Sequence, residues 1–147
     1  MSEERQLTWW DDGAEESPRL GLVVRRPWVD LIVDGVKTWE LRGSATRIRG
    51  AIALIEAGTG TIVGTARLVG VEGPLTPAEY RAAGALLGNV GVEEGDLPYA
   101  QTYAWVLRGA RRLPSPVPYD HPSGAVIWVR LSDAVRERLH SSTDSIV

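Results

Sequence analysis

The sequence predicts a mainly β (α+β) fold, in which short strands form a small, curled or closed barrel that carries three helices. Short segments of apolar or alternating residues recur between turn residues, as they do in small barrels. Glycines interrupt the longest of these segments, and glycines in such positions mark places where a sheet bends. Helix signals appear after the first strand, in mid-chain and near the C-terminus.

The first strand, the first helix and the second strand follow one another closely. Residues 21–24 form a short apolar run, which indicates a strand. An apolar stripe at helical spacing follows and ends at Gly35, a residue suited to the left-handed conformation after a helix. From Lys37 the period changes to two, which places Glu40 and Arg42 on one face of the second strand.

The next two strands are predicted to form a hairpin. Residues 51–57 and 61–71 are rich in apolar and β-branched side chains, and a Gly-Thr-Gly turn separates them. Gly64 and Gly70 lie inside the second of these strands, where they indicate bulges or bends.

The second half of the chain alternates between helices, strands and loops. A capping box with proline at the first helical position, Thr76-Pro77-Ala78-Glu79, begins the middle helix. The later elements are predicted in this order: helix to residue 87, loop 88–101, strand 102–107, proline-containing loop 111–124, strand 125–131 and helix 133–140.

Composition excludes several kinds of site. The chain has no cysteine, so disulfides, thiolate metal sites and a cysteine nucleophile are excluded, and two histidines are too few for a histidine-rich metal centre. We predict no metal and no other cofactor. The first residues lack the basic and apolar segments of a signal peptide, and the apolar runs are too short to span a bilayer. We therefore expect a cytoplasmic protein with no membrane partner.

Charge divides the 147 residues into an arm, one domain and a tail. Residues 1–18 carry six acidic residues and one arginine, and we predict that this acidic arm docks through Trp9-Trp10. Residues 19–140 are predicted to form the domain, and residues 141–147 a polar tail.

A basic region opens the domain, although the net charge of the chain is −3. Residues 19–49 carry seven basic and three acidic residues, a balance of +4. Because salt screens distant charges beyond about 10 Å, such a region can attract phosphates whatever the total charge. Lys37 lies within it and is the only lysine beside fifteen arginines. An ammonium can lose its proton when desolvated, whereas a guanidinium stays charged, so Lys37 is a candidate site residue.

One motif resembles the signature of a known family. After Arg26-Pro27-Trp28 and an apolar helix comes the spaced sequence Gly35-x-Lys37-x-x-Glu40-x-Arg42. This combination resembles the ASCH domain, a family of the PUA-like β-barrel superfamily, over roughly residues 20 to 131. The resemblance implies a PUA-like barrel with a cleft beside its first helix, where RNA or a modified nucleotide is bound.

The resemblance also implies which side chains occupy the cleft: Arg26, Trp28, Lys37, Glu40 and Arg42. Arg42 is suited to a phosphate or carbonyl group, and Glu40 to a base amino group or to holding Lys37. The charged trio can equally form an internal salt bridge, and Trp28 can stack on a base or pack in the core. His121 lies in a loop that can border the cleft, although a lone loop histidine is more often structural.

Three functions remain open at this point. The first is a module that binds single-stranded RNA or a modified nucleoside. The second is a hydrolase acting on RNA or an acylated nucleoside, with Lys37 as general base and Glu40 as its orienting partner. In the amidohydrolase subgroup that the family includes, a threonine nucleophile is expected where this chain has Glu40, which weakens that transfer. The third is a regulatory module that binds a protein partner through the Trp9-Trp10 arm.

Overall fold

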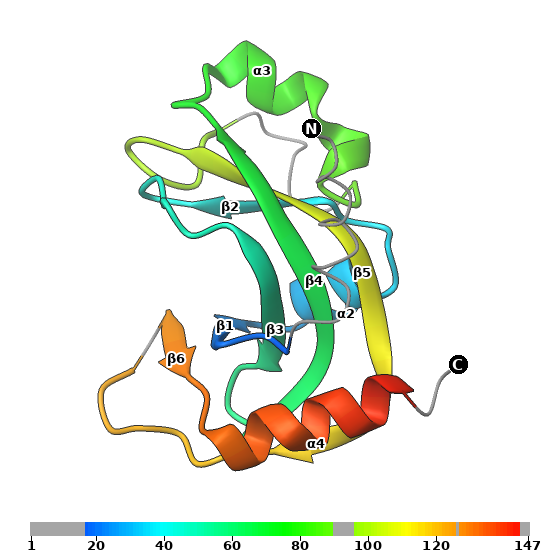
Figure 1. The fold of residues 1–147 in the computed structure, drawn as a ribbon. Helices are drawn as coiled ribbons and strands as arrows, with labels where there is room; N and C mark the ends of the chain where they lie inside the picture. The colour runs from blue at the N-terminus through cyan, green and yellow to red at the C-terminus, as the bar shows by residue number, and fades with distance from the viewer. Residues whose placement is uncertain (1–16, 90–95, 126, 145–147) are drawn as a thin grey trace, which may run out of the picture.

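The computed structural model describes residues 17–89, 96–125 and 127–144 (Figure 1). These residues form a six-stranded sheet accompanied by three α-helices, which confirms the mainly β (α+β) prediction. The elements, in chain order, are β1 (Leu20–Val24), α2 (Trp28–Val33), β2 (Trp39–Arg42), β3 (Gly50–Glu56), β4 (Thr61–Glu72), α3 (Pro77–Ala82), the 3₁₀ turn η1 (Gly84–Leu86), β5 (Tyr103–Pro118), β6 (Trp128–Arg130) and α4 (Asp133–Asp144).

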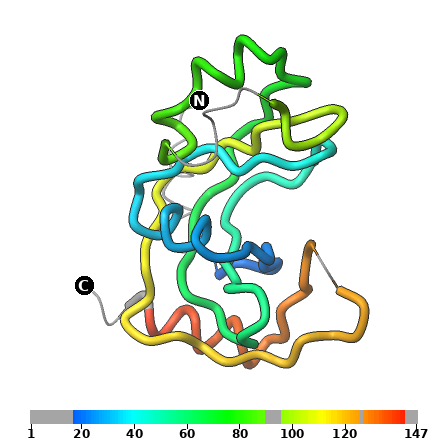
Figure 2. The backbone as a smooth tube through the Cα atoms, turned by 180° about the vertical axis from the view of Figure 1, so that it is seen from behind, coloured from blue at the N-terminus to red at the C-terminus, as the bar shows by residue number. Residues whose placement is uncertain are grey.

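The sheet curls into a half-barrel whose two ends approach each other. Its strand order is β2-β5-β4-β3-β1-β6, with β1 and β3 parallel and the other neighbours antiparallel. The rings of Trp105 on β5 and Trp128 on β6 are stacked, with centroids 5.7 Å apart. The Arg42 guanidinium on β2 also donates to the Val23 carbonyl on β1, at 2.9 Å. Seen from behind, the first helix and the chain that follows it lie across the middle of the curled sheet (Figure 2).

Bulges in β4 permit this curl. The pairing of β4 with β5 shifts register next to Gly64 and again next to Gly70, as predicted for both glycines. At Gly64 the missing side chain also makes room for α2, because a Cβ there would lie 2.5 Å from a methyl carbon of Val33. The bulged strand thus allows α2 to pack closely on the sheet.

Three apolar clusters hold the helices in place. The largest joins α2 to the sheet through the buried residues Val29, Ile32 and Val33. A second lies under α4, where Val135 and Leu139 pack on β3, β4 and β5. A third contains Tyr80 of α3, and Trp39 and Leu41 of β2 pack against it. The second and third clusters place α4 and α3 at opposite ends of the molecule (Figure 1).

The capping box of α3 forms as its sequence predicts. The Thr76 hydroxyl accepts from the Glu79 amide at 3.1 Å, and the Glu79 carboxylate accepts from the Thr76 amide at 2.8 Å. The α-helix ends at Ala82, and η1 continues to Leu86, so the predicted helix divides into two short pieces.

The prediction of a loop over residues 111–124 is wrong for its first half. β5 continues through Pro114 and Pro116 to Pro118, and within this stretch Leu113 and Val117 are buried. β2 pairs with residues 103–106, so among the described residues β4 is the only strand that pairs with this half of β5. A strand with one free edge tolerates prolines, because their missing N–H groups are not needed for a second ladder.

The C-terminal helix is longer than predicted and holds the start of the domain. It continues to Asp144, four residues beyond the predicted end at residue 140. Arg136 on this helix donates to the carbonyls of Pro18 and Ser17, at 3.2 and 3.1 Å, and the Ser17 hydroxyl donates to the Arg136 carbonyl. The Trp9-Trp10 pair, whose docking the sequence predicts, lies outside the described residues.

Candidate functional site

A cavity of about 600 Å³ opens where the end of β1, the start of α2 and β2 meet. This size falls within the range of about 300–1,000 Å³ that is typical of small-molecule sites. The cavity is lined by aliphatic, aromatic and charged side chains: Val23, Val24, Arg25, Trp28, Lys37, Glu40, Leu41, Arg42, Ala57, Gly58, Tyr80, Leu87, Pro98, Tyr99, His121 and Ala125.

Lys37 is a buried ammonium at this cavity, with 3% of its side chain exposed. It reaches this position because α2 ends at Val33 and Gly35, with a φ of +80°, then turns the chain, after which Lys37 forms an isolated bridge with Leu87. Its Nζ donates to the Trp39 carbonyl and lies 3.7 Å from Oε1 of Glu40. An ammonium has three donors, so the contacts with Trp39 and Glu40 leave one donor for a ligand.

Glu40 and Arg42 share one face of β2, as the period-two pattern predicts. Oε2 of Glu40 accepts from Nε of Arg42 at 2.9 Å and lies 2.9 Å from its Nη2. Nη2 also donates to the Val23 carbonyl, and the guanidinium lies over the Trp105 ring, 5.5 Å from its centroid. Arg42 therefore holds Glu40 by one carboxylate oxygen and leaves the other, Oε1, beside Lys37.

The burial of Lys37 lowers its pKa from the ordinary value of 10.5. Removal from water is the largest cause, the Glu40 carboxylate opposes it and raises the pKa, and the Arg42 charge lowers it further. The neutral amine therefore forms at a lower pH than it does for a lysine in water.

We predict that the Glu40→Gln substitution lowers the pKa of Lys37 further, because it removes the opposing carboxylate while desolvation and Arg42 remain. Lys37 is the only lysine, so a single Cε resonance in a protein labelled with ¹³C-lysine reports its titration. A pKa that is unchanged or higher in the Glu40→Gln variant would contradict this account of the site.

Aromatic side chains form part of the cavity wall. Trp28 is half-buried, and it packs against the largest apolar cluster while also lining the cavity. Tyr99 is 43% exposed and its ring lies against Gly43, where a Cβ would be 3.2 Å away. His121 is fixed by two contacts of 2.7 Å, with the Tyr119 hydroxyl and the Ala125 carbonyl. Since a carbonyl only accepts, Nε2 of His121 is the donor to the Ala125 carbonyl.

The structure brings together Trp28, Lys37, Glu40 and Arg42, four of the five residues predicted for the cleft, and His121 joins them. Arg26 is not among the lining residues, and its Nε lies 2.8 Å from Oε2 of Glu56.

Among the charged and aromatic lining residues, sequence reasoning missed Arg25, Tyr80 and Tyr99. The signal for Arg25 was its place in the same basic region as Arg26. Tyr80 carried none beyond its position in a predicted helix, and Tyr99 lies in a predicted loop far from the motif.

The described residues contain no group of three or more histidine, aspartate or glutamate side chains that could hold a metal ion. In the same part of the chain, none of the helices has both the length and the apolar character needed to cross a membrane.

Together, the curled sheet, the helix after its first strand and the cavity between them define a PUA-like domain. The model of the ASCH domain matches residues 22–115, more than half of the chain. This protein therefore belongs to the ASCH domain family.

Solved structures support the fold. The crystal structure of ASCH from Zymomonas mobilis matches with a TM-score of 0.60 and 16% identity, covering 83% of this chain and 93% of that one. Two mutant forms of the same protein match with TM-scores of 0.55 and 0.57 and 15% identity, covering 86% and 83% of this chain and 97% and 96% of theirs. At these identities the likeness shows a shared fold. No curated protein matches the sequence.

Proposed function

We propose that this protein is a module that binds single-stranded RNA or a modified nucleotide, with one base in the cavity beside α2. The observation that carries the proposal is the pairing of a donor, Lys37 Nζ, with an acceptor, Glu40 Oε1, 3.7 Å apart at a cavity large enough for a nucleoside.

A nucleobase edge suits this pair because it presents N–H donors close to nitrogen or oxygen acceptors. Glu40 would accept from a ring or exocyclic N–H, and Lys37 would donate to the neighbouring acceptor. The bonds from Arg42 to Oε2 fix the carboxylate in advance, so little order has to be imposed when the ligand binds.

The aromatic wall and the rim supply the remaining contacts. Unstacked bases commonly lie on aromatic side chains, at about 1–3 kcal/mol per base, and Trp28 and Tyr99 are placed to offer such faces. The exposed Arg25 at the rim would contact a phosphate, assisted by the basic region of residues 19–49.

We predict that the protein binds short single-stranded RNA with a steep dependence on salt, and that Arg25→Ala weakens binding and reduces the salt slope by about one. Fluorescence anisotropy with a labelled octanucleotide, measured across a range of salt concentrations, tests this. Arg108→Ala is the matched control, since Arg108 is also exposed but does not line the cavity. Equal losses of RNA affinity in the two variants would show that RNA is attracted to any exposed arginine, and would contradict binding at this cavity.

The ligand itself is best found by thermal shift. A compound that binds only the folded protein raises its melting temperature, and a panel of modified nucleosides tests the cavity directly. We expect the shift produced by a binding nucleoside to disappear in the Glu40→Gln variant, which removes the acceptor charge and keeps the side-chain shape.

A hydrolase acting on RNA or an acylated nucleoside is the second candidate, and the lowered pKa of Lys37 favours it. A neutral amine at a cavity can take a proton from water or from a ribose hydroxyl, and Glu40 would keep the amine oriented.

We predict that Lys37→Arg abolishes any turnover of RNA or N4-acetylcytidine, because it keeps the charge and removes the titratable amine. In the wild-type enzyme the rate should rise with pH as the pH passes the lowered pKa of Lys37. Turnover that persists in Lys37→Arg would exclude Lys37 as the base. If the wild-type protein binds these compounds without turning them over, only the binding function is supported.

A further inference from the structure

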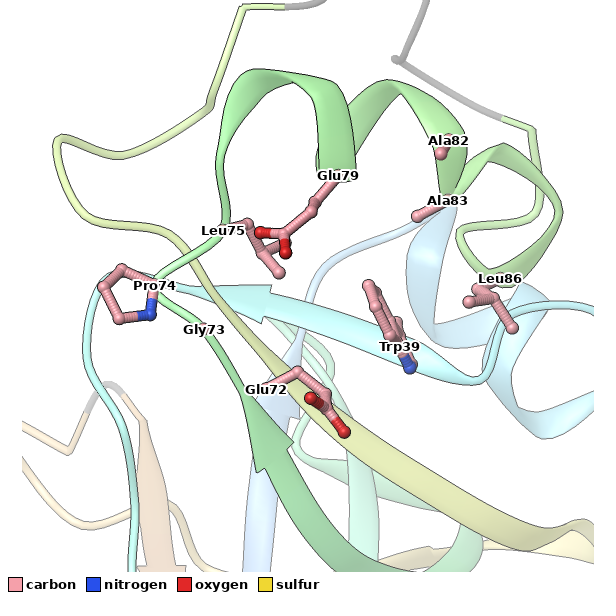
Figure 3. Close-up of a pocket in the computed structure, with 9 residues that line it drawn as sticks. All are labelled: Trp39, Glu72, Gly73, Pro74, Leu75, Glu79, Ala82, Ala83 and Leu86. Carbon is pink, nitrogen blue, oxygen red and sulfur yellow. The ribbon is translucent and has the colours of Figure 1, made fainter.

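A second hollow is also lined by a residue of β2. It has a volume of about 420 Å³ and lies between α3, the end of β4 and β2 (Figure 3). Trp39 lines this hollow, whereas the next three residues of β2, Glu40, Leu41 and Arg42, line the cavity. Leu75, Ala83 and Leu86 add apolar surface to its wall.

We propose that this hollow binds an arginine or lysine side chain of a partner polypeptide. Its described lining contains two carboxylates, Glu72 and Glu79, and no basic residue. A side chain with an aliphatic stem and a cationic end complements this combination of apolar walls and negative charge.

Glu79 is fixed in place before any ligand arrives. Its Oε1 is held by the Thr76 amide at 2.8 Å in the capping box, and the side chain reaches from α3 into the hollow (Figure 3). The second oxygen accepts no hydrogen bond from the described residues, so it is available to a cation. A capping box thus serves both to begin α3 and to orient a binding group.

Trp39 supplies the aromatic part of the site. It is half-buried and stands on β2 between Glu72 and Leu86 (Figure 3). A guanidinium or ammonium over an indole ring is attracted by the negative face of that ring, and carboxylates beside it add charge-assisted hydrogen bonds.

Other occupants fit less well. A phosphate would be repelled by Glu72 and Glu79, and two carboxylates give too few ligands for a metal ion within the described residues. Residues 1–16 carry a net charge of −5, so the same carboxylates disfavour the chain's own acidic arm.

A polypeptide partner is favoured over a free small cation by the surface beside the hollow. Leu86 lies at the edge of the hollow and is 41% exposed, and Val36 is 51% exposed. The two lie on neighbouring segments, because the amide of Thr38 donates to the Leu86 carbonyl. These aliphatic side chains offer contacts to the residues flanking an arginine or lysine, which a polyamine lacks. RNA in the cavity and a basic partner in the hollow would then occupy two separate sites that β2 helps to line.

The test uses the full-length protein and a fluorescein-labelled peptide, Gly-Leu-Arg-Leu-Arg-Gly, with a counterpart that carries citrulline in place of both arginines. Citrulline keeps the shape and removes the charge. Anisotropy should show clearly tighter binding of the arginine peptide, weakened about threefold or more by Glu72→Gln and by Glu79→Gln. Glutamine at position 79 still supports a capping box, so α3 is retained.

Glu137→Gln is the matched control, because it makes the same change in net charge on α4, at the opposite end of the molecule. Equal weakening by this control, or equal binding of the citrulline peptide, would overturn the proposal. Displacement of the arginine peptide by spermidine at equal concentration would assign the hollow to free polyamines instead. Binding that appears only after residues 1–16 are deleted would assign it to the arm, which would also overturn the proposal.

Discussion

Replacing Arg42 with alanine is expected to lower the free energy of unfolding by about 3 kcal/mol, because removing one partner of a buried ion pair leaves Glu40 with only the Lys37 ammonium, 3.7 Å away, among the described residues. Arg42 and Glu40 are only 15% and 10% exposed, so water cannot take over the lost contacts. The substitution also removes the donor to Val23 that links the two ends of the half-barrel, and the contact with Trp105.

The matched control is Arg112→Ala. Arg112 pairs with Asp30 at 3.4 Å and Asp34 at 3.1 Å, but all three side chains are more than 40% exposed. Exposed pairs are generally worth about 0–1 kcal/mol, so this variant should unfold nearly as the wild type does. Urea denaturation of both variants measures the difference. Equal destabilisation would mean that the trio at the cavity is no more than another surface salt bridge.

Adding one methyl group at Gly64 is the second change with a large expected effect. A Cβ there would lie 2.5 Å from the Arg111 carbonyl oxygen and 2.5 Å from Cγ1 of Val33. Since neither a paired strand nor a packed helix can move freely, we expect Gly64→Ala to cost about 1–3 kcal/mol. Displacing α2 would also shift Trp28 at the cavity, so nucleoside binding should weaken as well.

Gly70→Ala tests whether this cost comes from the close contact and not from the strand. Gly70 lies on the same strand and beside another register shift, but a Cβ there would meet nothing within 4 Å. We expect the stability of the Gly70→Ala variant to be unchanged or slightly raised, because alanine reduces the conformational freedom of the unfolded chain. Urea midpoints that fall equally for both variants would contradict the explanation given for Gly64.

Local patterns in the sequence were sufficient to predict much of the fold. The capping box depends on residues three apart, and the shared face of Glu40 and Arg42 depends on the two-residue period of a strand. Both features are set within one element, so no knowledge of distant contacts is needed. The bulges at Gly64 and Gly70 were predicted for the same reason.

Features that depend on distant parts of the chain were missed. β5 can continue through its prolines because β2 ends early and leaves one edge of β5 unpaired among the described residues. The sequence of β5 alone does not reveal where β2 ends. The stack of Trp105 on Trp128 depends on how far the sheet curls. Tyr99 meets the cavity from a loop, and the hollow beside Trp39 exists only once α3 has packed near β2.

The most direct test of the central proposal uses the only lysine of the chain. In protein labelled with ¹³C-lysine, the Cε resonance of Lys37 is followed while single-stranded RNA or a binding nucleoside is added. A base in the cavity predicts a saturable shift of this one signal, with the same dissociation constant that anisotropy gives for the ligand. Binding that saturates while the Lys37 signal stays unchanged would place the ligand elsewhere and contradict the account.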